Sequence, residues 1–150
     1  GGTMVMKINL QFFGGRGSSS GLGGGRMTIA GFLKNFRNAS ESDLGKLGLK
    51  VDRAQFTENG NSIKLQSAQV QNGADRVEVS FYSNYNPLQV SNSQSNIISS
   101  ISIRHYKDGD IQAYKEVINK KTKSVKNAKK NYDEVLQTWK KITKQKSISY

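Results

Sequence analysis

Hydrophobic positions near the start of the chain alternate, and they change to helical spacing after a glycine-rich tract. Every second residue from Ile8 to Phe12 is apolar, which predicts a short strand or an extended docking peptide within 6–13. Residues 14–25 contain seven Gly and three Ser, and the backbone entropy of such a tract predicts a flexible linker. Thr28 can then cap a helix, because apolar residues follow at helical spacing: Ile29, Phe32, Leu33 and Phe36.

A second, shorter helix is predicted after Ser40. Ser40 and Asp43 resemble a capping box in which Asp takes the place of the usual Glu. Leu44 and Leu47 lie on one face of this helix, and Gly48 can serve as its C-terminal stop.

The middle of the chain has the alternating pattern of antiparallel strands. Asn59-Gly60 lies between two strand-like runs, and this dipeptide is a strong hairpin signal. A second hairpin is expected around Gly73, and a polar loop with the only proline, Pro87, precedes the last run. The pattern predicts four antiparallel strands, at 51–56, 62–70, 76–82 and 96–106.

The last third of the chain is predicted to form one long helix over 110–144. Its apolar positions recur in alternating steps of three and four residues, and only Lys121 interrupts this seam. The helix would be roughly 50 Å long at about 1.5 Å per residue. It can pack on the sheet or pair with a second helix, which leaves a homo-oligomer open. The seam consists of Ile111, Tyr114, Ile118, Lys121, Val125, Ala128, Tyr132, Val135, Trp139 and Ile142.

Together these elements predict a single small α+β domain over 27–150. It comprises an antiparallel sheet of about four strands, a short N-terminal helical region and one long, basic C-terminal helix. Residues 1–26 stand apart from it as a cloning remnant, a leader peptide and the glycine-rich linker.

Composition excludes several kinds of site. The 150 residues include no Cys and a single His, so disulfides, thiolate zinc sites, cysteine nucleophiles and paired-His metal sites are all excluded. We expect no cofactor and no metal. No apolar run approaches the roughly 18 residues that span a bilayer, so we expect a soluble protein without a membrane partner.

Charge is concentrated in the C-terminal third of the chain. The net charge is +12, of which residues 101–150 contribute +8. Six lysines and no acid lie between Lys120 and Lys130, so neighbours such as Lys126 and Lys130 repel each other across one helical turn. A phosphate backbone would relieve this repulsion, whereas the alternative is a solvated face that keeps the protein soluble. The residues predicted to bind nucleic acid or a partner are Arg104, Lys107, Lys115, Lys120, Lys123, Lys126, Lys129, Lys130, Lys140 and Lys141.

Candidate catalytic residues are few, and we predict that the protein is not an enzyme. His105 shares strand parity with apolar neighbours, which favours a structural role over that of a general base. Asp108 and Asp110 could bind Mg²⁺ together with Glu116, but Asp is also favoured in turns and at helix N-caps. A guide-RNA-cleaving nuclease that uses these four residues is the minority alternative.

Aromatic residues fall into two groups. Tyr114 and Trp139 lie on the helical seam with Tyr132, which favours packing over base stacking. Tyr82, Tyr85 and Tyr106 could stack on single-stranded RNA if the sheet has an open face, although no RNA-recognition signature accompanies them.

One segment resembles known proteins. The run KINLQFFGGRGSSSG at 7–21 is similar to a leader found on proteins of phages and conjugative elements of low-GC Gram-positive bacteria. This leader is shared by otherwise unrelated proteins, including phage minor head proteins and anti-CRISPR proteins directed at the type II effector nuclease. The resemblance implies origin more directly than activity, and it implies the cytoplasm of a bacterial host as the location.

Two functions follow from the leader, the small size and the basic helix. The first is an anti-CRISPR inhibitor that binds the type II CRISPR effector nuclease or its guide RNA, and blocks assembly or DNA targeting. The high positive charge argues against mimicry of DNA and for RNA or an acidic protein surface. The alternative is a virion-associated, minor head or DNA-packaging accessory protein, in which the leader docks and the helix assembles or contacts DNA.

Overall fold

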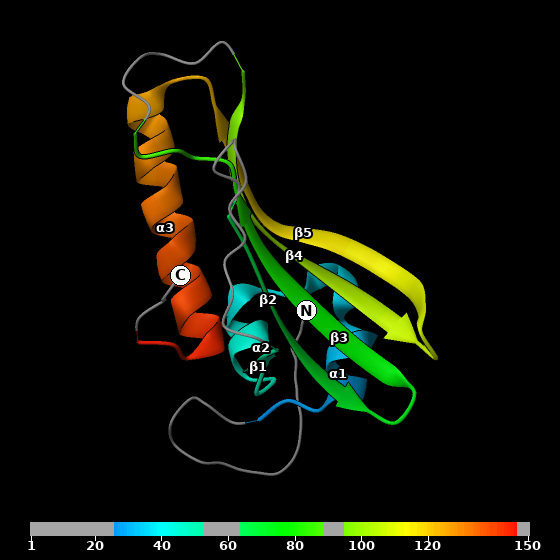
Figure 1. Ribbon diagram of the computed structural model, residues 1–150. Coiled ribbons are helices and arrows are strands. Elements are labelled where there is room, and N and C mark those ends of the chain that lie inside the picture. Colours follow the sequence, from blue (N-terminus) through cyan, green and yellow to red (C-terminus); the bar gives the residue numbers. More distant parts are fainter. Residues whose placement is uncertain (1–25, 53–63, 89–94, 147–150) are drawn as a thin grey trace.

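The protein is an antiparallel sheet with its helices packed on one side. The computed structural model describes residues 26–52, 64–88 and 95–146. Five strands lie in the order β1-β2-β3-β4-β5, so each pairs with its neighbours along the chain (Figure 1). The predicted α+β class is confirmed, with five strands rather than four. The elements are α1 (Ile29–Lys34), the 3-10 helix η1 (Phe36–Asn38), α2 (Glu41–Gly45), β1 (Lys50–Val51), β2 (Lys64–Asn72), β3 (Asp75–Ser83), β4 (Ile97–Lys107), β5 (Asp110–Thr122) and α3 (Val125–Thr143).

The two N-terminal helices begin where their capping residues predict. The Thr28 hydroxyl accepts a hydrogen bond of 3.0 Å from the Gly31 amide at the start of α1. At α2, the Asp43 amide donates to the Ser40 hydroxyl at 3.3 Å, and the Ser40 amide donates to the Asp43 carboxylate at 2.9 Å. The capping box is therefore confirmed. Gly48 lies beyond the end of α2 and has a φ of +71°, a conformation that favours glycine.

One face of the sheet forms the core. Val77, Val79 and Phe81 of β3 are fully buried and lie opposite His105, Ile103 and Ile101 of β4. They share one hydrophobic cluster with residues of α1, α2 and α3. Because side chains alternate along a strand, a second face lies on the other side, which we call the outer face. It carries Arg76, Glu78, Ser80 and Tyr82 of β3 together with their cross-strand partners.

The predicted helix over 110–144 is wrong in its first third. Residues Asp110–Thr122 form β5, which pairs along the whole of β4, and the helix begins only at Val125. The two strands are joined at Asp108-Gly109, where both φ values are positive, +51° and +85°. Positive φ at two successive residues is typical of a type I′ hairpin turn, which Asp-Gly favours.

Two β-bulges explain why β5 resembles a helix in sequence. The register against β4 shifts by one residue at Ile101/Ser102 and again at His105/Tyr106. Each bulge adds a residue, so a face that normally recurs every two residues steps by three at those points. The spacing of Ile111 and Tyr114 is one such step. The next residue of the predicted seam, Ile118, lies on the core face opposite Ile101, so the seam of three- and four-residue steps crosses from one face of β5 to the other.

Helix α3 buries the remainder of the predicted seam against the sheet of its own chain. Its inward residues belong to the core cluster, and so this part of the seam is used within the molecule. They are Ala128, Tyr132, Val135, Trp139 and Ile142. Within the described ranges, no helix has the length and hydropathy needed to cross a membrane. The predicted segments at 6–13 and 14–25 and the Asn59-Gly60 hairpin lie outside the described residues.

Candidate nucleic-acid interface

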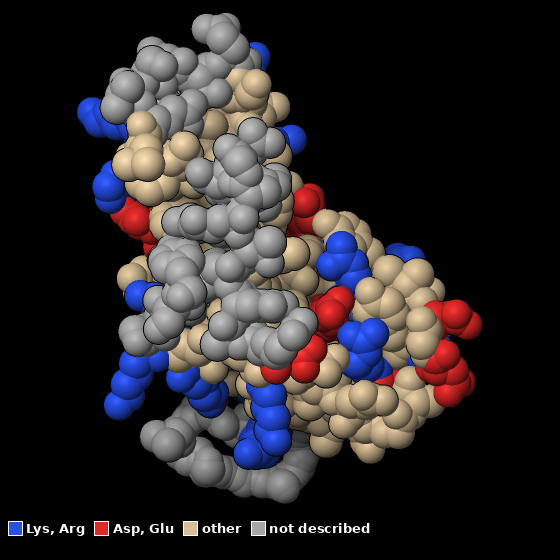
Figure 2. Space-filling model, in the orientation of Figure 1, with Lys and Arg blue, Asp and Glu red and all other residues tan. Residues whose placement is uncertain are grey.

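The basic residues of α3 lie on the side of the helix that faces away from the sheet. Lys126, Lys129, Lys130 and Lys141 are exposed, whereas the inward positions of the helix are buried. Figure 2 shows Lys and Arg side chains along the side of the molecule that α3 forms, with acidic side chains among them. The face is therefore mixed in charge, and the partners of each lysine decide which of them can serve a ligand.

Lys115 belongs to the fold rather than to the basic surface. It lies in β5, and its ammonium donates hydrogen bonds to the backbone carbonyl oxygens of Arg37 at 2.5 Å and Ala39 at 3.1 Å. Burial lowers the pKa of Lys115, and the nearby Asp43 carboxylate opposes that effect. Lys115 thus ties β5 to the end of η1, where the last carbonyl oxygens of a helix need donors from outside it.

Two further lysines are paired with the acids of α3. Lys120 of β5 contacts Glu134 at 2.6 Å, and this hydrogen bond and charge lower the pKa of Glu134. Lys129 contacts Asp133 one turn along the helix at 2.8 Å, which raises the pKa of Lys129. The charge of Lys130 also lowers the pKa of Glu134, so this acid offsets part of the positive charge near Lys130.

Lys123, Lys126 and Lys130 form the strongest candidate for anion binding, and we call them the N-terminal lysine cluster. Lys123 directly precedes the N-cap Ser124, and the other two lie in the first turns of α3. None of the three has an ion-pair partner within the described part of the chain. The first turn of α3 contains no acid, although the positive end of the helix dipole favours one. These lysines therefore oppose both one another and the helix dipole.

Lys140 and Lys141 lie at the negative, C-terminal end of the α3 dipole. They lie in the last turn of α3, and Lys144 forms the C-cap with a φ of +58°. Cations at a helix C-terminus are favoured by the helix dipole. Stabilisation of the helix therefore accounts for these lysines without a ligand, whereas it gives no reason for the N-terminal lysine cluster.

Arg104 and Lys107 lie away from α3. Lys107 ends β4 beside the Asp108-Gly109 turn, at the opposite end of that strand from the connection between β5 and α3. Arg104 lies on the outer face, where its guanidinium carbon is 5.0 Å from the centroid of the Tyr114 ring. The ten predicted binding residues are thus spread over both sides of the molecule rather than along one helix.

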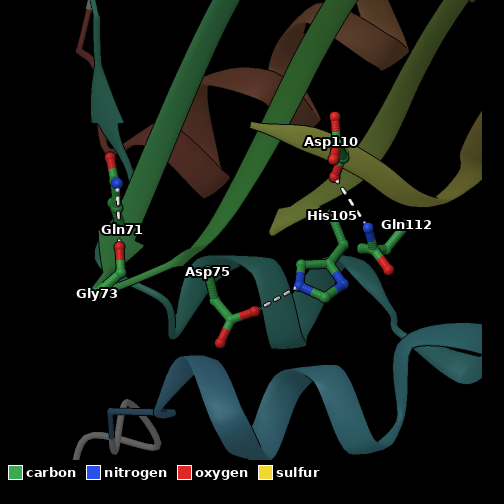
Figure 3. Close-up of polar contacts among 6 residues, drawn as sticks. All are labelled: Gln71, Gly73, Asp75, His105, Asp110 and Gln112. Carbon is green, nitrogen blue, oxygen red and sulfur yellow. Dashed lines mark hydrogen bonds and ion pairs between the residues drawn. The ribbon is translucent and has the colours of Figure 1, made fainter. Parts of the chain in front are cut away.

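The candidate catalytic residues are not brought together. His105 lies on the core side of β4, and its Nε2 is 2.8 Å from Oδ1 of Asp75 (Figure 3). Glu116 lies on the outer face and accepts a 2.7 Å hydrogen bond from the Asn119 amide. Asp108 occupies the hairpin turn, and Asp110 starts β5 rather than capping a helix. Among the described residues, no three His, Asp or Glu side chains are placed to hold a metal ion.

Sequence reasoning missed two residues with specific contacts. Asp75 is the partner of His105, and Arg76 has its guanidinium carbon 4.1 Å from the centroid of Tyr106. Both depend on pairing between β3 and β4, which the sequence does not reveal. Asp108-Gly109 was the available signal for the hairpin between β4 and β5. Regular pairing from that turn would have placed Arg104 opposite Ala113, and only the bulge at His105/Tyr106 places it opposite Tyr114. No family model, curated protein or solved structure matches this chain.

Proposed function

We propose that this protein is a mobile-element-encoded antagonist of host defence. In this proposal it binds the guide-RNA-loaded type II CRISPR effector nuclease, or the guide RNA alone, and blocks assembly or DNA targeting. The contacts are made to phosphates through the N-terminal lysine cluster.

The positive charges at the start of α3 support the proposed binding to nucleic acid. Lys126 and Lys130 are one turn apart and repel each other, which costs about 0.2–0.5 kcal/mol. The adjacent helix N-terminus adds its own positive potential. A bound phosphate would be attracted both to the two lysines and to the helix N-terminus. Its binding would also release counterions from the nucleic acid. A lysine is a flexible point charge, so this contact would follow the backbone without reading bases.

The leader at 7–21 supports the biological setting. Its resemblance to leaders on proteins of phages and conjugative elements favours a role in conflict between such elements and their hosts. A net charge of +12 favours an anionic target, and a guide RNA is a polyanion.

Size-exclusion chromatography tests the proposal. The full chain is run with and without the effector nuclease and its guide RNA at about 150 mM salt, which screens loose ionic contacts. We expect co-elution with the guide RNA or the loaded nuclease. Substituting Gln for Lys123, Lys126 and Lys130 should abolish it, and the salt dependence of RNA binding should fall by about one unit of slope per lost contact.

A matched control has the same change in net charge. Gln at Lys140, Lys141 and Lys144 also removes three positive charges from α3, but at its C-terminal end. This variant should retain most of the binding. Equal losses in the two triple variants would indicate a general charge effect and would contradict the assignment to the N-terminal lysine cluster.

The virion-associated function is the second candidate because the leader also resembles those of phage minor head proteins. It predicts that the protein elutes separately from the nuclease and forms an assembly of its own. Helix α3 cannot supply that assembly through its apolar seam without leaving the core. An oligomer that persists in the Lys123, Lys126 and Lys130 variant, without nuclease binding, would favour this candidate.

A further inference from the structure

The outer face of the sheet has the composition of a binding surface rather than of a core. Tyr82, Tyr106 and Tyr114 lie on this face in three adjacent strands, and none of them belongs to the hydrophobic cluster. Tyr114 has half of its surface exposed, at 51%. The described helices pack on the opposite side, so this face is built from strand side chains alone.

Two arginines are paired directly with tyrosines across the strands. Arg76 lies opposite Tyr106, with its guanidinium carbon 4.1 Å from the ring centroid, and Arg104 lies opposite Tyr114 at 5.0 Å. Arg76 is also held by Gln69 Oε1 at 3.2 Å. Arg76 also contacts the Glu78 carboxylate at 3.5 Å, so its charge is partly engaged within the face. Arg104 is positioned against the Tyr114 ring before any ligand binds, which lowers the entropy cost of a contact with a base or phosphate.

Small side chains separate the aromatic rows. Ser80 of β3 lies opposite Ser102 of β4, between the row that contains Tyr82 and the row that contains Tyr114. These two rows are four residues apart along β4, which is about 13 Å at roughly 3.3 Å per residue. Ser102 is buried and Glu116 lies opposite it in β5, so the row between the two aromatic rows is low and polar, and planar groups can lie against the rings on either side of it.

One lysine lies on the outer face itself, near the connection between β5 and α3. Lys121 lies on this face at the end of β5, opposite Ile98, and it precedes the N-cap of α3, Ser124, by three residues. An RNA strand that places its bases on the tyrosines therefore has Lys121 at one end of this face for a phosphate. Two large apolar side chains are exposed on this face, Leu65 opposite Tyr82 and Ile111 opposite Tyr106, and polar rows separate them. A protein partner would need an apolar centre, which this arrangement does not provide.

We propose that the outer face binds a single-stranded segment of RNA, with bases stacked on Tyr82 and Tyr114 and a phosphate directed toward Lys121. Arg104 offers a planar cation to a neighbouring base. This inference rests on the proposed RNA binding and deepens it, because it adds unpaired bases to the phosphates as recognised groups.

Two oligonucleotides separate base contacts from phosphate contacts. One is a labelled single-stranded RNA of about 12 nucleotides, a length within reach of one small domain. The other has the same length and charge but carries abasic sites. Fluorescence anisotropy with the full chain should give roughly 30-fold tighter binding of the base-bearing strand, because each of two stacked bases contributes about fivefold or more.

Three variants assign this preference. Tyr82→Ala with Tyr114→Ala should remove most of the 30-fold preference, whereas Tyr82→Phe with Tyr114→Phe should keep it, because Phe retains the ring. The lysine variant, with Gln at Lys123, Lys126 and Lys130, should weaken the binding of both strands equally. Circular dichroism and thermal melts of the Phe and Ala pairs establish that each remains folded.

The outcomes distinguish the two proposals. If wild-type protein binds both strands equally and loses both in the lysine variant, the phosphate contact stands and the outer-face inference is overturned. A preference that survives in the Ala pair would also overturn it. If wild-type protein binds neither strand, RNA binding fails altogether and both proposals fall.

Discussion

The indole Nε1 of Trp139 donates a 2.6 Å hydrogen bond to Oε1 of Gln66, which joins α3 to β2 in the centre of the core. Trp139 is fully buried and Gln66 is 1% exposed. Gln66 Oε1 also accepts a 3.0 Å hydrogen bond from Gln145, just beyond the end of α3. A single buried carbonyl group thus anchors both the body and the C-terminal end of the helix.

Replacing Trp139 with Phe should lower the free energy of unfolding by about 2 kcal/mol. The change removes a donor from a buried acceptor and leaves space beside the Phe81 ring, whose centroid lies 6.0 Å from that of Trp139. Urea denaturation measures the loss. The double variant Trp139→Phe with Gln66→Leu should be less destabilised than the sum of its single variants, because it leaves no unpaired carbonyl group. Strict additivity would indicate that the hydrogen bond contributes little.

Opposite ends of α3 should respond with opposite signs to the same substitution. Lys126→Glu should raise the free energy of unfolding by about 0.5 kcal/mol, because it places an acid in the first turn, four residues before Lys130. Lys141→Glu should lower it by a similar amount, since it removes a cation from the last turn. Denaturation at low salt measures both changes. A loss of stability in Lys126→Glu would contradict the electrostatic argument for the N-terminal lysine cluster.

Lys115→Met should destabilise the protein by about 1 kcal/mol near pH 7, because two backbone carbonyl oxygens lose a donor. Burial lowers the pKa of Lys115 below 10.5, so the unfolded chain binds more protons than the folded chain just below that pH. The stability of wild-type protein therefore gains a contribution as pH rises through this range. The Met variant lacks this contribution, so the difference in stability between the two proteins should widen as pH rises toward 10.5.

The pH series needs a lysine that is not engaged in the fold. Lys121→Met provides it, since Lys121 lies on the same strand but is exposed on the outer face. Its stability should differ from that of wild-type protein by a constant amount over the same pH range. If the Lys115→Met difference also stays constant or narrows, burial does not control the pKa of Lys115.

The Asp108-Gly109 turn should tolerate changes in charge but not in backbone conformation. Asp108→Asn should alter stability by less than about 0.5 kcal/mol, because Asn adopts positive φ readily. Gly109→Ala should cost about 1–2 kcal/mol, because φ is +85° there and a Cβ atom is strained in that region. Thermal unfolding measures both variants. A large effect of Asp108→Asn on RNA binding with unchanged stability would instead support a functional role for the carboxylate.

Features that depend on contacts within a few residues are predicted correctly from the sequence, whereas features that depend on pairing between distant segments are not. Thr28 and the Ser40/Asp43 capping box are predicted correctly, because each contact spans three residues. The helix predicted over β5 is wrong, because two bulges imposed by β4 break the alternation of that strand. The density of lysines identifies them as candidates, but no local pattern separates Lys126 from Lys120, which pairs with Glu134 across 14 residues.

By itself, the sequence determined the α+β class, the local helix caps and the excess of positive charge toward the C-terminus. These depend on composition, periodicity and contacts within one turn of chain. Tertiary structure decided which lysines are engaged in the fold, where His105 finds Asp75, and that Arg76 and Arg104 meet tyrosines on a single face. Those relationships depend on strand register, which is set by pairing between distant segments and so cannot be read from any local pattern.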